Sequence, residues 1–98
     1  MLQKIIIRPE AQNDIDSAFN WYEEKNTGLG REFALEFSSS VDRIIGNPQL
    51  YSELYRGIRR ALVRKFPYGI YYHLNGKDIV IFAVLHLAMN PMKWRDRS

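Results

Sequence analysis

The 98-residue sequence predicts an α+β fold of the order strand, helix, helix, strand, strand, strand (β-α-α-β-β-β), in which a helical hairpin packs on one face of a small, mainly antiparallel sheet. Apolar residues recur at helical spacing in the first half of the chain. The second half is instead rich in β-branched and aromatic residues that are separated by turn signals. This length leaves room for one core, so we assign residues 1–98 to a single domain.

The first half predicts a short strand and then two helices. Residues 3–8 are rich in β-branched side chains, and Pro9 suits the first position of a helix that we expect to end near Asn26. Its apolar stripe consists of Ala11, Ile15, Ala18, Phe19 and Tyr22. Gly28 and Gly30 supply a turn, after which a second helical stripe consists of Leu29, Phe33, Phe37, Val41, Ile44 and Ile45. The two helices should therefore form an antiparallel hairpin.

The second helix should stop at Asn47, because the residue before a proline is biased away from helical backbone angles. Three strands are then predicted, at Ile58–Phe66, Ile70–Leu74 and Ile79–His86. The turn signals between them are Pro67-Tyr68-Gly69 and Asn75-Gly76, of which the second is a strong hairpin signal.

The composition excludes several functional classes. With 46% hydrophobic residues the chain can form a packed core, and without cysteine it has no disulfide, no thiolate nucleophile and no cysteine-based zinc site. We expect no cofactor and no metal. The apolar run at residues 5–7 is too short for a signal peptide, and no segment approaches a membrane span, so we expect a cytoplasmic protein with no membrane partner.

The positive charge is concentrated in one segment. The formal net charge is +3, and residues 56–65 hold five cations without any carboxylate. These cations are Arg56, Arg59, Arg60, Arg64 and Lys65. Such a patch attracts either phosphate backbones or an acidic protein surface, and charge alone does not choose between them.

Several short motifs occur in an order that one protein family shares. They are Arg8-Pro9-Glu10-Ala11, Asp14-Ile15, Trp21-Tyr22-Glu23-Glu24, Gly28-Leu29-Gly30, Asn47-Pro48-Gln49-Leu50-Tyr51, the basic strand from Arg56, and Ala83-Val84-Leu85-His86. In this order the chain resembles the ParE branch of the RelE/ParE toxins. The resemblance implies a RelE/ParE-like fold and the toxin of a type II toxin–antitoxin system, which acts by inhibiting DNA gyrase and is not itself an enzyme. It also implies that a cognate antitoxin neutralises the toxin and that the complex contacts operator DNA indirectly, through the antitoxin.

The expected binding residues fall in two groups. Antitoxin carboxylates would meet the basic strand, and Trp21, at the edge of its helical stripe, is a candidate anchor for a partner helix unless it packs under the Thr27–Leu29 loop. The expected antitoxin-binding residues are Trp21, Arg56, Arg59, Arg60, Arg64 and Lys65. For gyrase binding, the expected residues are Lys93, Trp94 and Arg95, which we place outside the core.

The alternative is a RelE-like, ribosome-dependent and metal-independent endoribonuclease. Its base, acid and cations would come from Arg59, Arg60, Arg64 and His86, with His73, Tyr71 or Tyr72 as further titrating groups. Strand alternation instead makes His73 a surface residue, and His86 could simply bond the backbone at a strand end. Family members often carry arginines after this histidine, and this chain has Leu87 and Ala88 there, which disfavours RNA cleavage. A toxin relic that only binds its antitoxin is the third hypothesis.

Overall fold

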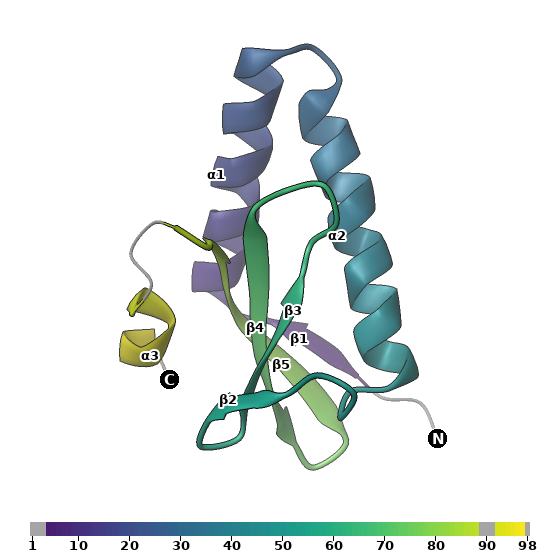
Figure 1. Cartoon of the computed structure of the whole chain (residues 1–98), viewed down its shortest axis with the longest axis vertical. Coiled ribbons are helices and arrows are strands. Elements are labelled where there is room, and N and C mark those ends of the chain that lie inside the picture. The colour runs from purple at the N-terminus through teal and green to yellow at the C-terminus, as the bar shows by residue number, and fades with distance from the viewer. Residues whose placement is uncertain (1–3, 89–91, 98) are drawn as a thin grey trace.

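The computed structural model describes residues 4–88 and 92–97 and contains a five-stranded sheet with two long helices on one face (Figure 1). The elements are β1 (Ile5–Ile7), α1 (Pro9–Lys25), α2 (Leu29–Gly46), β2 (Glu53–Tyr55), β3 (Ile58–Leu62), β4 (Tyr68–Asn75), β5 (Asp78–His86) and α3 (Lys93–Arg97). The strand order is β1-β5-β4-β3-β2, and only the β1–β5 pair is parallel. The predicted α+β class with a helical hairpin on a mainly antiparallel sheet is therefore confirmed.

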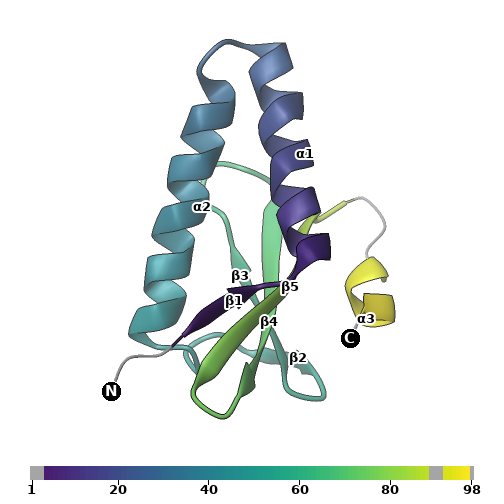
Figure 2. The ribbon, with the colours of Figure 1, turned by 180° about the vertical axis from the view of Figure 1, so that it is seen from behind.

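Viewed from behind, α1 and α2 lie in front of the sheet and run antiparallel (Figure 2). Glu23 fixes the turn between them, because its two carboxylate oxygens each accept a 3.0 Å bond, from the Gly28 and Gly30 N–H groups at the start of α2. A carboxylate at this place also interacts favourably with the helix dipole.

Among the residues described, no helix is long and apolar enough to cross a membrane.

The main core lies between the helices and the sheet. Its centre is an aromatic cluster in which Tyr22 and Phe33 stack at 5.6 Å between ring centroids and both meet Phe66 and Tyr68 edge-on. The predicted stripes supply this core, except that Phe19 is half-buried outside the core cluster and Ile45 is 40% exposed. Consecutive helical residues point about 100° apart, so burying Ile44 turns Ile45 outward.

The other face of the sheet carries a second, smaller core. Opposite Tyr71 the register shifts, so that Tyr71 pairs with Ala83 while Tyr72 pairs with Ile81. This β-bulge turns both Phe82 and Ala83 toward the second core, together with Tyr71. Leu85 and the α3 residue Trp94 pack against the same cluster.

Two elements and several strand boundaries differ from the prediction. β2 and α3 were not predicted, and the strand expected to reach Phe66 ends at Leu62. Lys65 has a φ of 71°, so the chain turns before Pro67, and β4 starts at Tyr68 rather than Ile70. The hairpin predicted at Asn75-Gly76 is present, but only Gly76 has a positive φ, of 62°, while Asn75 pairs with Asp78. Gln3, at the predicted start of the first strand, lies outside the described residues.

Candidate functional site

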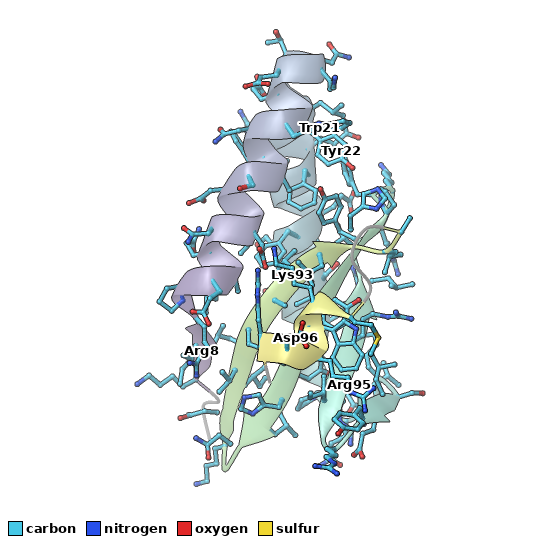
Figure 3. All side chains as sticks on the ribbon, turned by 90° about the vertical axis from the view of Figure 1, so that its left-hand side faces the viewer. Arg8, Trp21, Tyr22, Lys93, Arg95 and Asp96 are labelled. Carbon is cyan, nitrogen blue, oxygen red and sulfur yellow. The ribbon has the colours of Figure 1, made fainter. Side chains whose placement is uncertain are left out.

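A groove of about 750 Å³ opens on the sheet face that the helical hairpin leaves uncovered. Among the described residues its lining contains four arginines and a histidine and no carboxylate, and we call it the arginine groove. The lining residues are Arg8, Tyr55, Arg56, Gly57, Ile58, His73, Leu74, Phe82, Arg95 and Arg97. In Figure 3, Arg8 lies at the foot of α1, and Arg95 lies at α3 on the side away from Arg8. The groove thus collects cations from the β1–α1 junction, the β2–β3 turn and α3.

The β2–β3 turn brings Arg56 to the groove. Tyr55 pairs with Ile58, so the two-residue loop is Arg56-Gly57, and both residues have positive φ, at 44° and 83°. This is the pattern of a type I′ hairpin turn, in which asparagine or glycine is usual at the first position. The guanidinium carbon of Arg56 lies 5.1 Å from the centroid of the Tyr55 ring.

Arg95 of α3 packs against the same tyrosine ring. The guanidinium carbon of Arg95 is 4.2 Å from the Tyr55 centroid, which is within the range of a cation–π interaction. The neighbouring Trp94 stacks on Tyr71, with centroids 5.5 Å apart and an interplanar angle of 10°. The expectation that Trp94 lies outside the core is therefore wrong, because its ring covers the second core and thereby places Arg95 beside Arg56.

An ion pair between Asp14 and Arg97 closes α3 onto α1. Arg97 donates from both terminal nitrogens to the two oxygens of Asp14, at 2.5 and 3.1 Å, and both side chains are largely buried. The Val84 N–H also donates to this carboxylate, at 3.0 Å. Because Val84 lies beyond the three residues that pair with β1, Asp14 satisfies a backbone group that β1 does not reach. The hydrogen bond to Asp14 raises the pKa of Arg97 above its ordinary value, although partial burial opposes this shift.

The two remaining basic side chains of the groove are Arg8 and His73. Arg8 precedes α1 and makes a long, exposed ion pair with Glu10, at 4.0 Å, which contributes little. His73 is on the open face, as strand alternation predicts, but it is half-buried with its ring 5.8 Å from that of Phe82.

A second groove, of about 450 Å³, lies between α1 and the end of β5, and its lining is more apolar. We call it the Trp21 groove, and its lining residues are Asp14, Ser17, Ala18, Trp21, Tyr22, Tyr68, Val84, Leu85, His86 and Lys93. Trp21 is 53% exposed, meets Tyr22 edge-on and has the Lys25 ammonium 4.9 Å from its ring centroid. Of the two placements considered for Trp21, the structure has the exposed one.

The residues expected for a nuclease do not converge. Arg59 points to the helix side, where it donates to the Tyr51 carbonyl oxygen at 2.5 Å. Arg60 lies on the open face, beside Tyr71 across the strand pair and with its stem over Gly69. His86 lines the Trp21 groove on the helix side, and its Nδ1 accepts a 3.1 Å bond from the Ala88 N–H, which is the structural role considered above.

The remaining predicted residues are dispersed. Arg64 is exposed in the β3–β4 turn, and the Lys65 ammonium lies 3.7 Å from a carboxylate oxygen of Glu36 on α2. Lys93 faces the Trp21 groove, while Arg95 lines the arginine groove. Over the described residues no three His, Asp or Glu side chains gather as a metal site would require.

Sequence reasoning missed most of the arginine groove. It singled out Arg56 and Arg95, but assigned them to different partners, and it did not consider Tyr55, Arg8 or Arg97 as site residues. A glycine after Arg56, between two strand-like segments, was the available signal for the turn. No local pattern indicates that Arg97 reaches Asp14, 83 residues away.

Comparison with known proteins gives a family and two similar folds. A family described as the ParE toxin of the type II toxin–antitoxin system parDE matches residues 5–91. A chain of the chromosomal ParDE toxin–antitoxin system from P. aeruginosa is 18% identical, with a TM-score of 0.61 over 87% of this chain and 96% of that chain. A chain of the E. coli DinJ–YafQ toxin–antitoxin complex is 14% identical, with a TM-score of 0.63 over 93% of this chain and 99% of that chain. None of the curated protein sequences gives a significant match.

Proposed function

The chain belongs to the ParE toxin family of type II toxin–antitoxin systems, and from this premise we propose that it inhibits DNA gyrase and is neutralised by a cognate antitoxin. It would act in the cytoplasm, where gyrase works, and would reach operator DNA through the antitoxin.

The observation that carries the choice of gyrase over messenger RNA is the separation of the expected nuclease residues. A metal-independent cleavage site needs a base, an acid and cations around one phosphate. Arg59 and His86 lie on the helix side of the sheet, whereas Arg60 lies on the open side. These side chains cannot act on the same phosphate without a large rearrangement. The proposal therefore assigns them no catalytic role.

The Trp21 groove supports neutralisation by a helical segment of the antitoxin. Its exposed tryptophan lies beside apolar lining residues such as Leu85 and Ala18, and large aromatic residues of this kind dominate binding energies at interfaces. Lys25, over the Trp21 ring, and Lys93, in the lining, would favour a segment with carboxylates next to its apolar anchors.

The test compares two activities of one preparation. Purified gyrase, relaxed plasmid and ATP are incubated with the protein, and a ribosome-programmed messenger is incubated with the same protein in parallel. We expect loss of supercoiling with accumulation of cleaved DNA, intact messenger, and restored supercoiling when the antitoxin is added first. Cut messenger with normal supercoiling would contradict the proposal. Normal supercoiling together with intact messenger would identify the protein as a toxin relic.

A further inference from the structure

We propose that the arginine groove binds the phosphodiester backbone of a nucleic acid directly, without the antitoxin. Arg56 and Arg95 of this groove were expected above to bind antitoxin and gyrase, respectively, but the binding proposed here requires neither partner. It rests on the kind of cations in the groove, on how they are held and on what the groove lacks.

The groove presents guanidinium groups from three separate segments of the chain. Arg8, Arg56, Arg95 and Arg97 all line it, and no acidic side chain of residues 4–88 or 92–97 does. Arginine donates from a planar fork that matches a phosphate group and keeps its charge at any physiological pH. A groove with several such groups fits a polyanion with charges at intervals better than it fits a single small anion.

Aromatic packing holds two of these arginines in place. Arg56 and Arg95 both lie against the Tyr55 ring, at 5.1 and 4.2 Å from its centroid. A guanidinium that stacks on an aromatic ring can still donate hydrogen bonds from its edge. Both guanidinium groups are thereby held close to one aromatic ring.

The other two arginines are compensated to different degrees. Arg97 is bound by Asp14 and by the Phe82 carbonyl oxygen and so adds no net charge to the groove. Arg8 has only its long, exposed pair with Glu10. Arg8 and Arg56 therefore contribute net positive charge to the groove.

The groove offers little to a peptide. An acidic peptide that folds on binding needs apolar surface to offset its loss of conformational entropy. Of the apolar side chains in this groove, Ile58 and Phe82 are buried in the second core, Leu74 is half-buried, and Tyr55 has two guanidiniums near its ring. A phosphodiester backbone needs only cations and donors, so these observations favour nucleic acid over an acidic protein segment.

The test is fluorescence anisotropy of the full-length toxin alone with labelled 20-nucleotide single-stranded RNA, single-stranded DNA and duplex DNA, and with a glutamate-rich peptide of the same charge. We expect binding of at least one nucleic acid, with an affinity that falls linearly on a log–log plot as salt rises. The nucleic acid that binds most tightly identifies whether the natural ligand is RNA, single-stranded DNA or duplex DNA.

The decisive variant is the double substitution Arg56→Asn/Arg95→Gln. Asparagine suits the positive φ of residue 56, so the β2–β3 turn is retained. We expect about tenfold weaker binding at low salt and a salt slope reduced by about 2, since each lost phosphate contact lowers the slope by about 1. The control is Lys4→Gln/Arg31→Gln, which removes the same charge from two exposed positions outside the groove and should change affinity less than about twofold.

Three results would overturn the proposal. They are no binding of any nucleic acid at low salt, equal weakening by the two double variants, and binding of the glutamate-rich peptide alone. Because neither gyrase nor antitoxin is present, failure here leaves the toxin proposal standing, and failure of the gyrase assay leaves this one standing. Circular dichroism of both variants confirms that each is folded.

Discussion

Gly30 sets the distance between the two long helices. A methyl group added there would lie 2.6 Å from the Phe19 carbonyl oxygen and 2.9 Å from Oε1 of Glu23, which is the atom that the Gly30 N–H needs as its partner. Because the nearest obstacle is helix backbone, relief requires the helices to separate. We expect Gly30→Ala to lower the free energy of unfolding by about 3 kcal/mol in urea denaturation.

Gly46 supplies the matched control for this substitution. It is the last residue of α2, and a methyl group added there would meet no atom within 4 Å. Gly46→Ala should therefore stabilise the protein by up to about 1 kcal/mol, through the better helix propensity of alanine. Equal effects of the two substitutions would contradict the close-packing argument.

Tyr72 links the sheet to the loop that follows α2. Its hydroxyl donates a 2.6 Å bond to the Pro48 carbonyl oxygen, and burial raises the pKa of Tyr72 from 10.0 to about 12, although nearby Arg59 lowers it. The neutral phenol is thus favoured in the folded state. Its stabilising contribution is complete below pH 10 and is lost between pH 10 and 12, as the unfolded chain releases this proton first.

The corresponding variant is Tyr72→Phe. At pH 7 it should cost about 1–3 kcal/mol, because the Pro48 carbonyl oxygen loses its donor in a part-buried place. Between pH 10 and 12 the wild-type protein should lose about 2–3 kcal/mol more stability than the variant does. Tyr22 and Tyr68 also have raised pKa values, but they are present in both proteins, so the difference isolates Tyr72. Parallel stability curves for the two proteins above pH 10 would refute this assignment.

At the scale of elements, α3 depends on side chains far away in the sequence. Five residues are too few for a helix that is stable by itself. Its position is fixed by the stacking of Trp94 on Tyr71 and by the ion pair of Arg97 with Asp14. Removing one member of a largely buried pair leaves the other charge without a partner, which is strongly destabilising.

We therefore expect Arg97→Gln to cost about 3 kcal/mol and Arg31→Gln, an exposed control on α2, to cost less than about 0.5 kcal/mol. A double-mutant cycle with Asp14→Asn should show a coupling of at least about 1 kcal/mol. In a Trp21→Phe background, Trp94 is the only tryptophan, and its emission should shift to longer wavelength in Arg97→Gln. Additive stability losses with unchanged Trp94 emission would argue against α3 being held by this pair.

The same element marks the limit of what the sequence could predict. α1 and α2 were predictable because their apolar stripes are local and regular, and both bounds of α1 agree within one residue. α3 and the three-residue β2 were not, because tertiary contacts rather than local periodicity stabilise them. The bulge at Phe82 had no signal either, since the run from Ile79 to Leu85 is apolar on both faces.

The candidate sites show the same limit. Arg56 and Arg95 were identified singly from charge, but Tyr55 is what brings them together, and it lies in an unpredicted strand. The charge pattern of residues 56–65 predicted one electropositive patch. In the structure these cations divide between the helix side, the open face and the turns, because a strand sends alternate side chains to opposite faces.

At the scale of the whole molecule, the two grooves share one wall. Asp14 lines the Trp21 groove and Arg97 lines the arginine groove, and their ion pair joins the two. Lys93 and Arg95, two residues apart on α3, likewise face different grooves. A partner helix in the Trp21 groove would therefore contact α3 without covering the guanidiniums beside Tyr55, so the protein offers an apolar and a cationic surface that can be occupied separately.

This separation makes the antitoxin prediction specific to Trp21. In Trp21→Ala, antitoxin affinity should fall by about 2 kcal/mol, or roughly 30-fold, because the substitution removes the large exposed anchor of the groove. Leu35→Ala is the control, since Leu35 is similarly exposed, at 58%, but lies on α2 away from either groove. Titration calorimetry with the antitoxin measures both variants. Nucleic-acid binding by Trp21→Ala should match that of the wild-type protein. If Leu35→Ala lowers the antitoxin affinity as much as Trp21→Ala does, the antitoxin helix binds on α2 instead.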